Sequence, residues 1–238
     1  MLLPALGKAK TKAQGIQCLN NLRQMGLAWT LYADESTDRV PPNDFDHQND
    51  PKRTWVRGVL DLSADTPDNT NAVFLQTSPL WTYAPVLGIW KCPADRSTSK
   101  HGGRPIPRVR SVAMNSRLNN RDWEGEPWRI FYRTADMATP AQTWVLIDER
   151  PDSINNAAFS VIMVGRQPET VLRNWPGYFH GNGANLNFAD GHSEAHKWRD
   201  PRTVPPAKGR QMLRTDINTP SPNNQDLWWL IERTTSKR

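Results

Sequence analysis

The longest regular pattern of apolar and polar positions lies at the start of the chain. Over residues 5–34, apolar or small residues recur at a spacing of three to four, at Ile16, Leu19, Leu22, Met25, Gly26, Trp29, Tyr32 and Ala33. Polar side chains fill most of the remaining positions. This spacing predicts one helix about 45 Å long, which the Pro41-Pro42 pair prevents from continuing further.

Later in the chain the period changes to two, which is typical of strands. We predict strands at residues 108–115, 143–148, 158–164, 185–189 and 193–198. The last two flank Asp190-Gly191, a dipeptide that favours a tight hairpin. A short terminal element at 227–233 is expected to pack back onto this sheet.

The remaining segments read as loops because they are polar and rich in proline and glycine. Residues 43–78 are predicted as mainly loop with a short strand at 55–60, residues 79–90 as a short aromatic helix or turn, and residues 96–108 as a basic loop. One helix followed by antiparallel strands predicts the α+β class, with a long N-terminal helix on a small antiparallel sheet. We divide the chain into a helical segment, 1–34, and a β head, 35–238.

Composition changes this picture in two ways. Only 37% of the 238 residues are apolar, but eleven are tryptophan, so a few large aromatic side chains are expected to build the core. Of the net charge of +6, residues 1–33 contribute +4 through Lys8, Lys10, Lys12 and Arg23, with no acidic residue. A nucleic-acid-binding protein usually concentrates its charge on a folded face, so we expect no nucleic-acid partner. The lysines fit either a segment near lipid headgroups or a solvated helix face.

The two cysteines, Cys18 and Cys92, exclude a metal site built on C-x-x-C spacing. They can form one disulfide in an oxidising compartment, closing a loop of about 75 residues and stabilising the fold by roughly 4 kcal/mol. Two buried free thiols are the alternative. No stretch reaches the ~20 apolar residues of a membrane span, and no signal peptide is visible.

Two groups of residues are candidates for metal binding. His180, His192 and His196, with Asp190 and Glu194, could serve a zinc-dependent hydrolase. Three carboxylates and an amide follow the strand at 143–148 and suggest calcium, at Asp148, Glu149, Asp152 and Asn155. A turn whose side chains cap their own backbone is the alternative for residues 148–155. The chain has no G-x-S-x-G or P-loop motif.

Three segments together resemble a known family. They are the stretch L-L-P-A-L at 2–6 with the helix C-L-N-N-L-R-Q-M-G-L-A at 18–28, the motif K-C-P-A-D at 91–95, and His180 followed after nine residues by Asp190-Gly191. These segments resemble the prepilin-type "H-x9-DG" proteins of planctomycete and verrucomicrobial envelopes, which are similar to type II secretion pseudopilins. The likeness runs in patches along the whole chain.

The resemblance implies a pilin-like fold and a function in assembly and binding, without catalysis. It implies an apolar span upstream of residue 1, so that 1–34 is the remaining part of an inner-membrane anchor and the head is periplasmic. Expected partners are other pilin-like subunits and the secretion machinery. Major pseudopilins carry a calcium site in a C-terminal loop. The resemblance therefore implies candidate calcium ligands among the acidic residues Asp148, Glu149, Asp152 and Asp190. The alternatives are a secreted, tryptophan-rich carbohydrate-binding module and the metal-dependent hydrolase.

Overall fold

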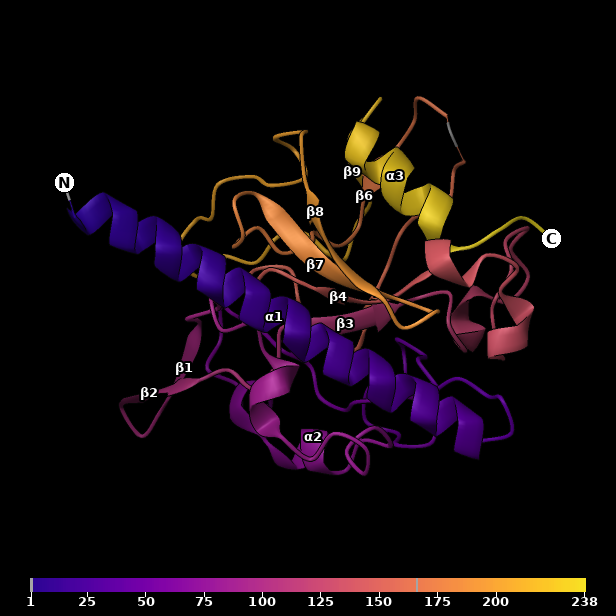
Figure 1. Ribbon diagram of the computed structural model, residues 1–238, viewed down its shortest axis with the longest axis horizontal. Helices are drawn as coiled ribbons and strands as arrows, with labels where there is room; N and C mark the ends of the chain where they lie inside the picture. The colour runs from indigo at the N-terminus through magenta and orange to yellow at the C-terminus, as the bar shows by residue number, and fades with distance from the viewer. Residues whose placement is uncertain (1, 166) are drawn as a thin grey trace.

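The fold consists of one long helix laid across a five-stranded sheet (Figure 1). The computed structural model describes residues 2–165 and 167–238, with side chains from residue 6 onward. The helices are α1 (Leu2–Glu35), α2 (Val73–Gln76) and α3 (Gln225–Thr234), with short 3₁₀ turns at Pro67–Thr70, Leu87–Trp90, Arg121–Trp123, Thr134–Asp136 and Pro140–Gln142. The predicted α+β class, with its long N-terminal helix and long loops, is confirmed.

The central sheet has the strand order β5-β3-β4-β7-β8 and is antiparallel except for the β3–β5 pair. Its strands are β3 (Val112–Asn115), β4 (Trp144–Asp148), β5 (Ala158–Phe159), β7 (Gly183–Phe188) and β8 (Ser193–Lys197). Two small ribbons lie outside it, β1 (Thr98–His101) with β2 (Arg104–Pro107), and β6 (Val171–Leu172) with β9 (Thr219–Pro220). The predicted β7–β8 hairpin is confirmed, with Asp190-Gly191 at its turn.

Three predictions for individual segments are wrong. Residues 96–108 form the β1–β2 hairpin, with Gly102 and Gly103 at its turn, where a loop is predicted. Residues 55–60 form no strand. The strand predicted at 158–164 ends at Phe159, because the Ser160 amide donates to the Asn174 side chain (3.1 Å) and not to a neighbouring strand.

Two apolar cores cover the two faces of the sheet. The first lies between α1, the sheet and the loops of residues 40–90, and contains Leu22, Met25, Trp29, Trp55 and Trp90. The second lies under α3 on the opposite face. None of the eleven tryptophans is exposed, since seven are buried and four partly buried. Most of the tryptophans therefore contribute to the two cores, as the composition predicts.

Helix α1 approaches strand β7 closely because the facing positions are small or polar. Gly26 of α1 lies directly against Asn187 of β7, and a Cβ atom built on Gly26 would lie 2.2 Å from the Asn187 Oδ1 atom. The Asn187 amide nitrogen donates to the backbone oxygens of Gly191 (3.3 Å) and His192 (3.0 Å), which fixes this side chain in place. Asn185 of β7 donates to the Gly15 carbonyl on α1 (3.3 Å).

On the opposite face, His196 of β8 makes an aromatic contact with α3. Its ring stacks on Trp229 with the ring centroids 3.7 Å apart. Burial lowers the pKa of His196 below its ordinary value of 6.5, and the positive charges of Arg233 and Arg199 act in the same direction against the opposing effect of Asp226. The folded environment therefore favours the neutral form of His196.

We expect this histidine to weaken the fold in acid. The unfolded chain takes up the proton near pH 6.5, but the folded chain resists it, so the unfolded state binds more protons below that pH and stability falls as the pH drops. The His196→Phe variant keeps the aromatic stack and removes the titration. Urea unfolding between pH 8 and 5 should show a smaller acid loss in the variant, whereas parallel curves for the two proteins would contradict this prediction.

Candidate functional site

Four side chains from distant parts of the chain meet beneath α1. Cys18 lies on α1, Cys92 follows the Leu87–Trp90 turn, Asp148 ends β4, and His180 precedes β7. One potential ligand atom from each lies within 4.8 Å of those of the other three. We refer to these four residues as the Cys/Asp/His cluster.

Backbone contacts hold the two cysteines at the cluster. The Cys92 amide donates to the Ser111 hydroxyl (2.7 Å), and the Asp95 amide donates back to the Cys92 carbonyl (3.0 Å), which makes K-C-P-A-D a tight turn. That turn is joined to α1 because the Gln14 side chain donates to the Pro93 carbonyl (2.9 Å). Cys18 and Cys92 are both buried and 1% exposed, and both are free thiols in this structure.

Asp148 contributes a carboxylate that is fully buried. One of its oxygens, Oδ1, accepts a hydrogen bond from the Asn185 amide, while Oδ2 is buried and has no hydrogen-bond partner among the described residues. The chain gives this carboxylate room at Gly177, where a Cβ atom would lie 2.3 Å from Oδ2. His180 is half-buried, and its Nε2 atom lies 3.2 Å from the Cys92 sulfur.

The four groups perturb one another electrostatically. A hydrogen bond from Cys18, with a second from His180, lowers the pKa of Cys92 to about 6, and the same contact together with burial raises the pKa of Cys18. Burial, together with the negative charge of Cys92, raises the pKa of Asp148 to about 8. Burial opposes the charged form of His180, but the hydrogen bond to Cys92 and the charge of Asp148 outweigh it and raise the pKa of His180. Without a bound cation, the cluster thus favours the protonated forms of Cys18, Asp148 and His180 and the thiolate form of Cys92.

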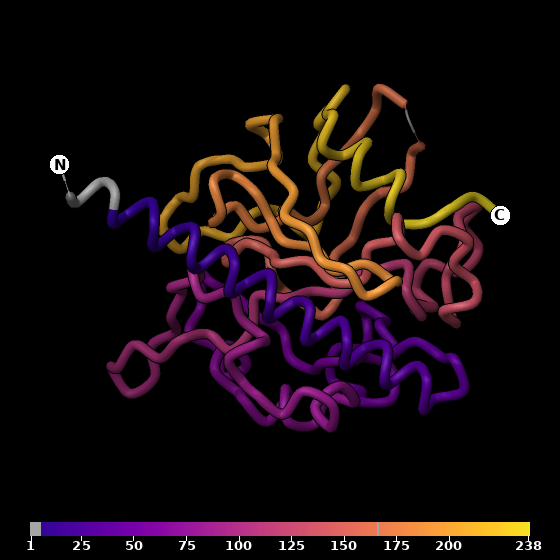
Figure 2. Tube along the Cα trace, viewed as in Figure 1, coloured from indigo at the N-terminus to yellow at the C-terminus, as the bar shows by residue number. Residues whose placement is uncertain are grey.

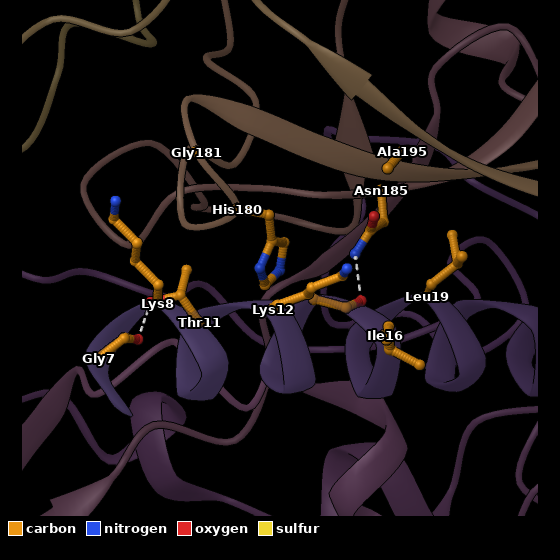
Figure 3. Close-up of a pocket in the computed structure, with 11 residues that line it drawn as sticks. Gly7, Lys8, Thr11, Lys12, Ile16, Leu19, His180, Gly181, Asn185 and Ala195 are labelled. Carbon is orange, nitrogen blue, oxygen red and sulfur yellow. Dashed lines mark hydrogen bonds between the residues drawn. The ribbon is translucent and has the colours of Figure 1, made fainter. Parts of the chain in front are cut away.

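A groove of about 700 Å³ lies beside the cluster, between the first half of α1 and the β7–β8 hairpin. Figure 3 shows His180 and Asn185 reaching from the sheet side toward α1, with the Lys8 and Lys12 side chains along the helix. His180 therefore connects the buried cluster to this groove.

The structure does not bring the predicted calcium residues together. Asp148 belongs to the Cys/Asp/His cluster, whereas Glu149 accepts hydrogen bonds from Ser153 (2.6 Å) and Asn174 (2.8 Å). Asp152 forms a buried ion pair with Arg150 (2.5 Å), and Asp190 is exposed at the hairpin turn. Among the described residues these four acids share no common site, so this geometry offers no oxygen cage for calcium.

The histidines proposed for a hydrolase are also separate from one another. His192 pairs with Asp190 (2.6 Å) at the hairpin turn, and His196 stacks under α3, while His180 is in the cluster. The H-x9-DG motif thus spans strand β7, with its histidine in the cluster at one end and its Asp-Gly turn at the other.

A second group of potential ligands, Asp44, His47 and Asp122, is a weaker candidate. The Asp44 carboxylate is already paired with Arg53 (2.6 Å) and Arg121 (3.1 Å), so its charge is satisfied without an ion.

The fold and this buried cluster define an α+β protein with a docked N-terminal helix. No family model, curated protein or solved structure matches the chain. Within the described residues, no helix has both the length and the hydropathy needed to cross a membrane.

Proposed function

We propose that this protein is a pseudopilin-like structural subunit of a type II secretion or pilus-like envelope system, which acts by assembly and binding. The observation that carries the proposal is the division of α1. Its C-terminal half packs on the sheet, where Leu22, Met25 and Trp29 are at most 1% exposed. In its N-terminal half the side chains of residues 6–13 are all exposed. Figure 1 shows the first turns of α1 projecting past the sheet, and Figure 2 shows the rest of the helix running along the head.

Such a division suits a subunit that assembles through its helix. The docked half fixes the direction in which the free half points, and the free half then presents its surface to neighbouring subunits. Leu6 is 63% exposed, and Ile16, at the start of the docked part, is 54% exposed, so this part of α1 carries apolar surface that a partner helix can cover.

The charge of the free half supports a position at the cell envelope. Lys8, Lys10 and Lys12 are all exposed within little more than one turn of α1, with no acidic residue in 1–33. Basic side chains beside an anionic membrane surface contribute about 1 kcal/mol each to binding. We therefore place the head outside the inner membrane, with the lysines facing the headgroups and other pilin-like subunits as partners.

Site-specific photo-crosslinking in the cells that make the protein tests this proposal. A crosslinking amino acid at Leu6 should form an adduct that mass spectrometry identifies as a second copy or as another protein with a pilin-like N-terminal helix. The matched control is Ile217, which is 45% exposed on the head. Failure of the Leu6 position to capture such a subunit, or equal capture from Ile217, would overturn the proposal.

A further inference from the structure

We propose that the Cys/Asp/His cluster binds one structural Zn²⁺ ion through two sulfur atoms, one carboxylate oxygen and one imidazole nitrogen. The inference is independent of the proposed function, since an ion at this position would hold α1 on the sheet whatever the free half of the helix contacts.

The arrangement of the donor atoms fits a small tetrahedral ion. Zinc ligands lie about 2.0–2.3 Å from the metal, which puts neighbouring ligand atoms roughly 3–4 Å apart. The potential ligand atoms of the cluster all lie within 4.8 Å of one another, and the Cys92 sulfur is 3.2 Å from His180 Nε2. Small movements of side chains are therefore enough to close the site.

The buried carboxylate of Asp148 is a second, separate indication of a cation. Its Oδ2 atom is inaccessible to solvent and has no hydrogen-bond partner among the described residues, although burying such an atom without a partner is costly. No guanidinium group among the described residues bonds to this oxygen, and the guanidinium of Arg150, two residues along the chain, pairs with Asp152. A metal ion supplies the positive charge that this oxygen lacks.

The mixed donor set favours zinc over the alternatives. Calcium requires six to eight oxygen ligands, and two of the four donors here are sulfur. A disulfide between Cys18 and Cys92 would consume both sulfurs and leave the Asp148 oxygen without a partner. Four protein ligands in a buried position are typical of structural zinc, whose binding displaces to solvent the protons that the donor atoms carry.

The ion would act as a staple between two parts of the fold. Cys18 is the ligand on α1, whereas the other three belong to the head. Removal of the metal should therefore loosen α1 first, while the core under α3 keeps its packing.

Metal analysis of the full chain tests the proposal. After purification with reductant and exposure to zinc followed by extensive dialysis, we expect about one zinc ion per chain. Cobalt in place of zinc should give the absorption bands of a tetrahedral thiolate complex. A strong chelator should lower the melting temperature, and added zinc should restore it. These measurements use the unaltered chain, so they remain valid if a variant fails to fold.

Variants identify the ligands. Cys92→Ser should weaken zinc retention at least tenfold. Asp190→Asn, which lies in the H-x9-DG motif with His180 but outside the cluster, should retain zinc as the unaltered chain does. Absence of retained zinc in the reduced chain would overturn the proposal. A Cys18–Cys92 disulfide found in native protein isolated with its thiols blocked would also overturn it, and would instead confirm the disulfide predicted from the sequence.

Discussion

Replacing Trp90 with alanine is expected to lower the free energy of unfolding by about 3–5 kcal/mol. Trp90 is completely buried, stacks on Trp55 with ring centroids 5.6 Å apart, and belongs to the core that α1 covers. Truncation would leave a cavity that the rigid indole of Trp55 cannot fill. Because domains are typically stable by only about 5–15 kcal/mol, this loss should be clear in urea unfolding followed by circular dichroism.

Two further variants separate the cavity from other effects. Trp90→Phe should cost much less, because it keeps an aromatic ring and removes an indole nitrogen that has no hydrogen-bond partner among the described residues. Val86→Ala, at a nearby position that is 54% exposed, should change stability by no more than about 0.5 kcal/mol. A loss below about 1 kcal/mol for Trp90→Ala would mean that this core is not packed as described.

The second large effect is expected at the contact between α1 and β7. Gly26→Ala should destabilise the protein by about 1–3 kcal/mol because the new methyl group would lie 2.2 Å from Oδ1 and 2.3 Å from Cγ of Asn187. Alanine is the better helix former by about 1 kcal/mol, so the steric effect must exceed the gain in helix propensity. Thermal unfolding of the two proteins measures the difference.

Gly7 on the same helix provides the matched control. A Cβ atom there has nothing within 4 Å, so Gly7→Ala should leave stability unchanged or raise it by up to about 1 kcal/mol. The opposite signs at the two positions would show that close approach, and not helix propensity, decides the result. In a double-mutant cycle, Asn187→Ala should relieve part of the cost of Gly26→Ala, whereas strict additivity would contradict the steric explanation.

Elements with a strong local pattern could be predicted from the sequence, and elements that depend on distant partners could not. The three-to-four spacing predicts α1, and Asp190-Gly191 predicts the β7–β8 hairpin. The strand predicted from residue 108 begins only at Val112, because Arg108 and Arg110 are buried and donate to carbonyl groups of residues 151–156. No local pattern indicates that a buried arginine will bind a distant loop.

The sequence contains one signal for the β1–β2 hairpin, its Gly-Gly turn, and one signal against it, the prolines of β2. Gly102-Gly103 is a favoured hairpin turn, and both residues adopt positive φ angles (58° and 78°). Pro105 and Pro107 disfavour a strand because proline has no amide proton to donate. An isolated, mostly exposed ribbon nevertheless tolerates proline at positions that need no amide donor.

The sequence indicates each member of the Cys/Asp/His cluster separately, but it does not predict that the four residues meet. It predicts a disulfide for the two cysteines, a calcium ligand in Asp148 and a motif residue in His180. Only the packing of α1 on the sheet brings them together. A usable signal was present, since three of the four residues lie in the three segments on which the family resemblance rests.

The nine residues between His180 and Asp190 contain strand β7, and the geometry of this strand explains why their number matters. Side chains alternate between the two faces of a strand, and here Asn185 and Asn187 meet α1 while Leu186 enters the opposite core. Adding or losing a single residue before Asn185 would reverse the two faces of the strand. The side chains of Asn185 and Asn187 would then enter the core under α3, and Leu186 would face α1. The spacing therefore keeps His180 at the cluster and Asp190-Gly191 at the hairpin turn while each side chain of β7 stays on its proper face.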